Sequence, residues 1–212
     1  MVRDEQILRS LVFRVKMLSL QQVAGYWWKD AVRSTAFAKR RMDQLCEAKL
    51  LDRRRVMAHP MLELAAPVST WTPGQPDPTP EEYEAVSYRL QARWEAGGPP
   101  EPTVVYLAHR RAVAQLGGAG GKLPPVGQET HDLHVSALYM RLIARGYAAG
   151  SRWLGEEILR PTRKQEKLPD AVLVDDDGKP NLIIEFGGRY KPERVRAFHE
   201  DARERQMRYE LW

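Results

Sequence analysis

The sequence predicts an α+β protein of two domains, and three observations carry this prediction. Helical apolar spacing in the first 50 residues gives way to two strand-like runs. The C-terminal part alternates helices with short apolar strands, which is typical of a mixed α/β sheet. Runs rich in proline and glycine divide the chain at 72–80, 97–102 and 117–125. We therefore expect an N-terminal domain over 1–72, a linker over 73–102 and a C-terminal domain over 103–212.

The composition is that of a folded protein, with 43% hydrophobic and 29% charged residues in a chain of 212. Cys46 is the only cysteine, which excludes a disulfide framework and a multi-cysteine zinc site. The opening residues MVRDEQILRS lack the apolar core of a signal peptide, and no run of about 18 apolar residues occurs. We expect a cytoplasmic protein with no membrane partner.

The net charge of +5 is unevenly distributed along the chain. Residues 1–60 hold 13 Lys and Arg residues against 6 Asp and Glu residues, whereas residues 61–212 hold 20 against 22. All the excess positive charge therefore lies in the first quarter of the chain. This asymmetry indicates a basic module whose partner is a polyanion.

Three helices are expected in the N-terminal domain. Apolar residues at helical spacing from Ile7 to Leu18 predict the first helix. Ser19 is expected to cap a second helix to Trp28, and Ser34 a third helix reaching about Leu51. The apolar set of the third helix is Phe37, Ala38, Met42, Leu45, Cys46 and Leu50.

Two candidate strands follow, over 53–58 and 61–70, with a turn at His59-Pro60. Three helices followed by a hairpin is the plan of the winged helix-turn-helix, in which the third helix enters the major groove of DNA. Polar and basic residues lie on this helix and at the start of the wing, where phosphate and base contacts are needed. The candidate DNA-binding residues are Ser34, Thr35, Lys39, Arg40, Arg41, Gln44, Arg53, Arg54 and Arg55. The alternative is a solvated helix face on a structural or protein-binding winged helix.

A single helix is predicted over 81–96, with an apolar edge amid charged residues. It could bridge the two domains or pair with a copy of itself in a dimer.

The C-terminal elements follow the order α-β-β-β-α-β. A strand over 104–107 and a helix to Gln115 precede this order. The elements are a helix over 131–146, strand-like runs at 153–160, 168–174 and 182–186, a turn at 175–180, a helix over 192–205 and a strand-like run over 207–212.

This order, with Pro169-Asp170 opening one strand and Glu185 ending another, resembles the PD-(D/E)xK nuclease core. The resemblance implies that Asp170 and Glu185, with Glu157 or Glu156 upstream, would bind Mg²⁺ and catalyse cleavage of DNA. A lysine two residues after the glutamate would act on the attacking water, and Gly187 stands at that position.

Because glycine carries no cation, we expect a catalytically degenerate core that needs no cofactor. Four lysines could still supply the cation from elsewhere: Lys164, Lys167, Lys179 and Lys191. In a purely structural role, Asp170 would cap a turn, and Glu185 would need a buried partner such as Arg189 or Arg152.

The chain as a whole is similar to the replication-relaxation proteins of plasmids and other mobile elements. The matching segments are 37–51, 104–116, 131–135, 153–160, 169–173 and Glu185, whereas 185–190 departs from the family pattern. The resemblance implies a sequence-specific DNA-binding regulator, a repressor linked to a mobile element or defence system. It would act as a homodimer on a palindromic site and use its nuclease-like domain for dimerisation or sensing. The alternatives are a metal-dependent DNA endonuclease or nickase, and a plasmid replication or mobilisation factor.

Two further motifs are interpreted as structural. His131 and His134 have a spacing that can hold zinc on a helix, but capping and packing explain them without further ligands. The glycine-rich run 117–122 lacks the ending of a phosphate loop and is interpreted as a flexible linker.

Overall fold

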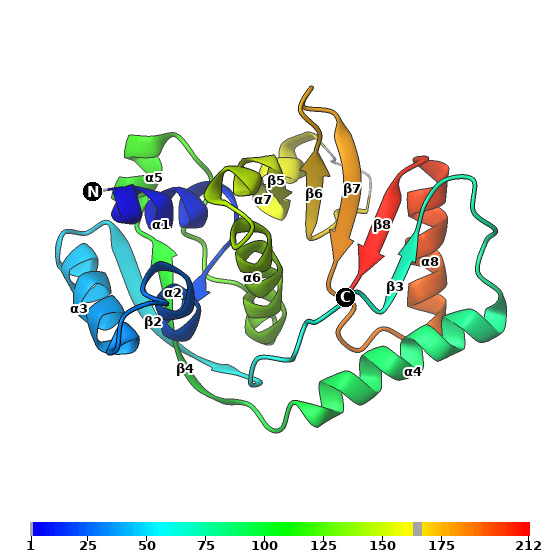
Figure 1. Cartoon of the computed structure of the whole chain (residues 1–212), viewed down its shortest axis with the longest axis horizontal. Helices are drawn as coiled ribbons and strands as arrows, with labels where there is room; N and C mark the ends of the chain where they lie inside the picture. Colours follow the sequence, from blue (N-terminus) through cyan, green and yellow to red (C-terminus); the bar gives the residue numbers. More distant parts are fainter. Residues whose placement is uncertain (1, 163–166) are drawn as a thin grey trace. The chain divides into compact units, whose positions relative to one another are not determined.

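The structure, a computed structural model, describes residues 2–162 and 167–212 and has a mixed α+β fold with two sheets (Figure 1). The fold class is thus confirmed as α+β. Contacts divide the chain into two compact units: unit 1 is residues 1–59 and 100–151, and unit 2 is residues 60–99 and 152–212. Both units are discontinuous in sequence, which differs from the contiguous domains expected.

Unit 1 is built around a three-stranded antiparallel sheet in the order β1-β4-β2. Its elements are α1 (Val2–Phe13), β1 (Leu18–Ser19), α2 (Leu20–Trp27), α3 (Ser34–Glu47), β2 (Leu51–Ala58), β4 (Glu101–Ala108), α5 (Arg110–Leu116) and α6 (Glu129–Ile143).

Unit 2 is built around a five-stranded mixed sheet in the order β3-β8-β7-β6-β5. A 3₁₀ turn, η1 (Tyr147–Arg152), precedes β5. The elements of unit 2 are β3 (Ser69–Trp71), α4 (Pro80–Ala96), β5 (Trp153–Gly155), α7 (Glu156–Leu159), η2 (Arg160–Thr162), β6 (Ala171–Val174), β7 (Pro180–Glu185), α8 (Pro192–Glu204) and β8 (Arg208–Leu211).

The predicted N-cap of α2 is confirmed, and the predicted N-cap of α3 is wrong. Ser19 caps α2 in a capping box: Gln22 N donates to Ser19 Oγ at 3.1 Å, and Ser19 N donates to Gln22 Oε1 at 2.8 Å. Ser34 does not cap α3, because it is already the first helical residue, and Arg33 holds the N-cap position without a side-chain hydrogen bond.

The predicted strand over 61–70 is wrong. β2 pairs instead with β4, from Leu51 opposite Ala108 to Ala58 opposite Glu101. The segment 104–107 is an uninterrupted apolar run that suits the middle of a sheet, whereas Pro60 and Pro67 interrupt the expected partner. Residues 59–100 are therefore an insertion between two paired strands, and this insertion carries β3 and α4 of unit 2.

Helix α6 also belongs to unit 1, although the sequence placed it in the C-terminal domain. Its Leu133 packs in one cluster with Met17, Val56, Val105 and Leu107. His134 is fully buried, and its Nδ1 lies 2.6 Å from the Thr130 carbonyl oxygen, which is a packing role.

The glycine-rich run is packed and not a flexible linker. Gly120 N donates to the carbonyl oxygen of Val12 at 3.0 Å. A Cβ at Gly120 would lie 2.1 Å from the Leu11 carbonyl oxygen, so only glycine allows this approach to the end of α1.

Helix α4 confirms the prediction over 81–96, and its apolar edge is covered within unit 2. Tyr83, Val86 and Leu90 are buried in a cluster with Ile183 of β7 and Phe198 of α8. This edge is therefore not an open face for a second copy of the helix. None of the described helices is both long and apolar enough to cross a membrane.

Candidate functional site

Three of the cations predicted to bind DNA are paired with acids, on two sides of α3. On one side, Lys39 Nζ lies 2.6 Å from Asp43 Oδ2, and Arg53 Nη1 of β2 lies 3.2 Å from Asp43 Oδ1. Because one carboxylate faces both cations, this cluster carries less positive charge than the sequence suggested. The spacing of Lys39 and Asp43, four residues apart on one helix, is the signal that could have found the pair.

On the other side, Arg41 is held by Asp4 of α1. Its Nε and Nη2 donate to the two carboxylate oxygens at 2.8 and 2.6 Å, and its Nη1 donates to Gln44 Oε1 at 2.7 Å. These hydrogen bonds hold the pKa of Asp4 below its usual value and raise that of Arg41. The guanidinium is therefore fixed within unit 1 and is not a freely swinging phosphate ligand.

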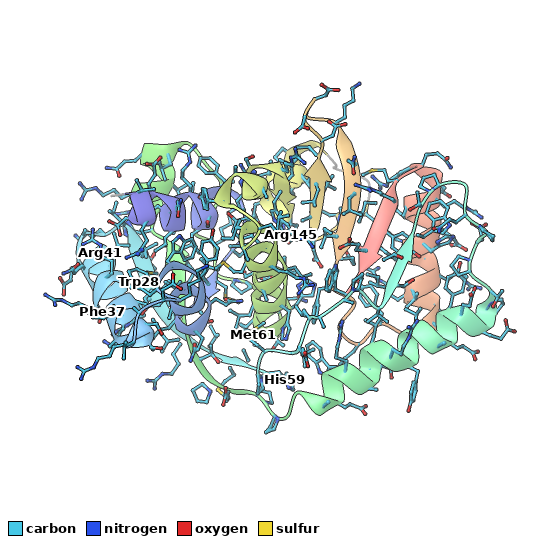
Figure 2. The ribbon with its side chains drawn as sticks, viewed as in Figure 1. Trp28, Phe37, Arg41, His59, Met61 and Arg145 are labelled. Atoms are coloured by element: carbon cyan, nitrogen blue, oxygen red, sulfur yellow. The ribbon has the colours of Figure 1, made fainter. Side chains whose placement is uncertain are left out.

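A shallow hollow of about 380 Å³ opens beside Arg41. Figure 2 labels three of its side chains, Trp28, Phe37 and Arg41. The hollow is lined by Arg3, Asp4, Trp28, Phe37, Arg40, Arg41 and Gln44.

The aromatic members of this hollow were not predicted as site residues. Arg3 stacks its guanidinium 4.5 Å from the centre of the Trp28 ring. Phe37 was predicted to face the core, but it is 51% exposed because Ala38, Met42 and Leu45 take the buried face.

Two predicted cations remain exposed and without an ion-pair partner in the described part of the chain, Arg40 of α3 and Arg55 of β2. Arg54 Nη2 lies 3.9 Å from Asp52, a weak surface contact. Ser34 and Thr35 lie in the first turn of α3, half-buried and exposed respectively.

The charge of the molecule is concentrated in unit 1. This unit holds 18 Lys and Arg residues against 9 Asp and Glu residues, a formal charge of +9, while unit 2 holds 15 against 19, a charge of −4. The strand and helices that come after the insertion thus add to the basic character of the N-terminal quarter.

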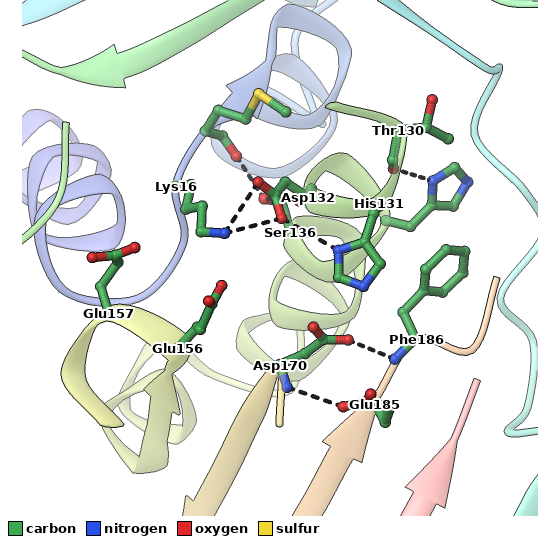
Figure 3. A network of polar contacts seen from close by, with 12 residues as sticks. Lys16, Thr130, His131, Asp132, Ser136, Glu156, Glu157, Asp170, Glu185 and Phe186 are labelled. Atoms are coloured by element: carbon green, nitrogen blue, oxygen red, sulfur yellow. Dashed lines mark hydrogen bonds and ion pairs between the residues drawn. The ribbon is translucent and has the colours of Figure 1, made fainter. Parts of the chain in front are cut away.

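The second candidate site is the pair of carboxylates in unit 2. Asp170 directly precedes β6 and lies beside Glu185 at the end of the antiparallel partner β7. Each carboxylate accepts a hydrogen bond from the other strand: Asp170 N donates to Glu185 Oε2 at 3.1 Å, and Phe186 N donates to Asp170 Oδ2 at 2.7 Å (Figure 3). The predicted strand pairing is confirmed, and the pair links the two strands.

Tyr190 also binds this pair. Its hydroxyl donates to Glu185 Oε1 at 2.5 Å, and burial together with the nearby Glu185 charge raises the pKa of Tyr190. Arg194 lies 5.1 Å from the centre of the Tyr190 ring. Arg152, expected as a partner of Glu185, pairs instead with Asp176.

Neither candidate for the third acid of the nuclease pattern, Glu156 or Glu157, forms a metal-binding group with Asp170 and Glu185 in the described part of the chain. Glu156 and Glu157 both accept from Arg160, at 2.5 and 3.4 Å. Across residues 2–162 and 167–212, no group of three or more His, Cys, Asp or Glu side chains is arranged to hold a metal ion.

Helix α4 fills the space at the position of the missing lysine. A Cβ at Gly187 would lie 2.8 Å from Leu90 Cδ1 and 3.0 Å from Leu211 Cδ1, and both leucines are buried. A side chain at residue 187 would therefore have to push aside the terminal methyl groups of these two buried leucines.

Of the four lysines that could replace it, Lys167 lines the same 250 Å³ cavity as Glu185 and Arg194. Its Nζ donates to the Ala197 carbonyl oxygen at 2.7 Å. Lys179 lies in the β6–β7 turn, at the far end of the strands from Asp170, and Lys191 precedes α8. Lys164 lies outside the described residues.

Comparisons of the chain with protein-family models, with curated proteins and with solved structures gave no match.

Proposed function

We propose that the protein binds double-stranded DNA through unit 1 and regulates transcription, as a repressor linked to a mobile element or defence system. The first six elements of unit 1, from α1 to β4, follow the order helix-strand-helix-helix-strand-strand, which supports a winged helix-turn-helix in which α3 is the recognition helix. In this interpretation β2 and β4 are the two strands of the wing, and the insertion replaces its tip.

The proposal rests on the +9 charge of unit 1 and on the exposed guanidiniums of Arg40 on α3 and Arg55 on β2, which have no ion-pair partner among the described residues. A surface of this kind releases counterions when it contacts phosphates, which is the main source of affinity for duplex DNA. Lys39 and Arg53 contribute less, because each is already paired with Asp43, whose negative charge would also lie close to a phosphate bound there.

The test is binding to fluorescent duplexes at increasing salt concentrations. Arg40→Ala and Arg55→Ala should each weaken binding to all sequences and reduce the salt slope by about 1. Lys39→Ala is the matched control, because Lys39 lies on the same helix as Arg40 but is already paired with Asp43. It should change the affinity and the salt slope less than Arg40→Ala does. Equal affinity of the wild type and the Arg40→Ala, Arg55→Ala double variant at all salt concentrations would contradict the assigned surface.

We further propose that two copies bind one palindromic site, because a single winged helix buries too little surface for high specificity. Light scattering with and without a selected duplex tests this. One protomer per duplex at saturation would contradict it.

Unit 2 is proposed to be a non-catalytic relative of the nuclease core. The filled space at Gly187 and the hydroxyl of Tyr190 on Glu185 support this role. The adjacent acids Asp170 and Glu185, with Lys167 on the same cavity as Glu185, favour metal-dependent nicking as the second candidate function. Incubation of supercoiled plasmid with Mg²⁺ or Mn²⁺ separates the two. Nicking that is lost in both Asp170→Ala and Lys167→Met would establish the enzyme.

A further inference from the structure

Gln44 has a fixed orientation that defines what it can recognise. We propose that Gln44 is a specificity-determining residue, that it donates a hydrogen bond from its amide to a guanine in the major groove, and that Asp4 and Arg41 are positioning residues for it. This inference rests on the proposed function of unit 1 and adds the base that α3 recognises.

The orientation follows from the chemistry of arginine. A glutamine amide can usually be turned either way, with its oxygen or its nitrogen toward a neighbour. The guanidinium of Arg41 has only donors, and its Nη1 lies 2.7 Å from Gln44, so the amide oxygen must face Arg41. The NH₂ group of Gln44 therefore points away from Arg41, and it has no hydrogen-bond partner among the described residues.

Arg41 is itself held in place. Its other two donating nitrogens are bound to the two oxygens of Asp4, so rotation of the guanidinium away from Gln44 would break a bidentate ion pair. The pair joins α1 to α3, both within unit 1, and the side chain of Asp4 is only 17% exposed. The three side chains are thus held in a hydrogen-bonded series: Asp4 orients Arg41, and Arg41 orients Gln44.

Gln44, the last residue of this hydrogen-bonded series, is accessible to a ligand. Gln44 is exposed and lines the 380 Å³ hollow. It shares one helical face with Phe37 and Arg41, because Phe37 and Arg41 are four positions apart and Arg41 and Gln44 are three positions apart. Arg40 is exposed beside it and can hold a phosphate. A base edge brought to α3 would therefore meet the NH₂ donors of Gln44 first, since the amide oxygen faces Arg41.

The donors select among the bases by their major-groove edges. Guanine presents two neighbouring acceptors, N7 and O6, whereas thymine presents one acceptor, O4, beside its methyl group, cytosine presents the N4 donor, and adenine places its N6 donor beside N7. The usual glutamine-adenine pair needs the amide oxygen to face the base and accept from N6, whereas in Gln44 this oxygen faces Arg41 and gives one of its two lone pairs to Nη1. Guanine is therefore the base that suits this orientation best.

The experiment is selection of bound duplexes from a randomised pool with the full chain, followed by affinity measurements on the selected site and its single-base changes. The wild type should prefer guanine at one position of each half-site by about fivefold or more. Gln44→Glu keeps an oxygen for Arg41 but presents an acceptor outward, so the preference at that position alone should change to cytosine. Gln44→Ala should leave no preference there.

The positioning role has its own readout. Asp4→Asn releases Arg41, so the guanine preference should fall while affinity for the rest of the site stays the same or rises with the freed cation. Asp4→Glu, which keeps the carboxylate, should restore the preference. A merely structural role of Asp4 would instead weaken binding to every sequence alike.

The outcomes separate this inference from the function it rests on. If the wild type selects no sequence and binds duplexes no better than Arg40→Ala does, both the proposed function and the inference fail. If the wild type selects a site and Gln44→Glu selects the identical site, the inference alone is overturned. A guanine-to-cytosine exchange confined to one position per half-site establishes it.

Discussion

Asp4 makes a contribution to stability that depends on pH. Arg41 holds the pKa of its carboxyl below the usual value of about 4, so the ion pair stabilises the fold at neutral pH and the stabilisation is lost as the pH falls through the lowered pKa. Because Arg41 is partly exposed, we expect about 1 kcal/mol at most.

Urea denaturation of the wild type and of Asp4→Asn tests this prediction between pH 7 and pH 3. The wild type should be more stable at pH 7, and the difference between the two midpoints should shrink toward zero at the acid end. A difference that does not change with pH would show that the charge of Asp4 is not responsible.

Restoring the nuclease lysine at Gly187 should damage the protein and not activate it. Gly187→Lys places its Cβ against Leu90 and Leu211, so we expect a loss of about 1–3 kcal/mol in the free energy of unfolding and no plasmid nicking. Gly187→Ala, which meets the same leucines with one carbon, should lose less. If Gly187→Lys is as stable as the wild type and nicks DNA with Mg²⁺, α4 does not block the site as described.

At the scale of residues, the contacts that could be predicted from the sequence are those between residues close together in the chain. Asp170 and Glu185 were placed side by side because strand register follows from a short turn between them. Tyr190 on Glu185, Asp4 on Arg41 and Leu90 over Gly187 were missed. The last two join residues far apart in the chain, and no spacing in the sequence reports such contacts.

Helix α4 begins with a capping box that the sequence contains in full. Glu82 N donates to Thr79 Oγ1 at 3.3 Å, Thr79 N donates to Glu82 Oε2 at 2.7 Å, and Pro80 occupies the first helical position. Thr79→Ala should therefore lower the free energy of unfolding by about 1 kcal/mol. Thr79→Ser, which keeps the hydroxyl, should retain most of the stability. Equal loss in both variants would assign the effect to the lost methyl group.

Among the elements, helices were predicted more accurately than strand partners. The helices over 80–96, 129–143 and 192–204 lie within a few residues of their expected bounds, since each has a repeating apolar face. The strand over 61–70 was wrong in all but its last two residues. Strand propensity depends on which neighbour is available, and here β4 lies beyond an insertion of some forty residues.

At the scale of the whole molecule, the chain passes from unit 1 to unit 2 and back before it finishes either one. Residues 60–99 leave unit 1 after β2 and return to it at β4. The proline and glycine run at 97–102 marks the return to unit 1, but the other two runs, at 72–80 and 117–125, lie within a unit. The boundary at residue 72 was expected from the run at 72–80, and the strand over 61–70 was included in the N-terminal domain on the assumption that it pairs with its neighbour over 53–58, which fails in this chain.

The discontinuous unit 1 predicts which fragment folds. A fragment of residues 1–72 lacks β4, the middle strand of the three-stranded sheet, so β1 and β2 have no partner in it and it should be unfolded. A second fragment would join residues 1–59 to 100–151 through Asn-Gly. Ala58 and Glu101 are already opposite each other at the end of the ladder, so a short loop can connect the strands.

This second fragment should unfold cooperatively on heating and keep dispersed amide resonances in its proton spectrum, whereas the 1–72 fragment should show neither property. It also keeps Asp4, Arg41 and Gln44, so it should retain the base preference of the full chain. Its affinity should be lower if unit 2 provides the dimer contact, because half-sites would then be bound independently. A folded 1–72 fragment would contradict the assignment of β4 as the central strand of unit 1.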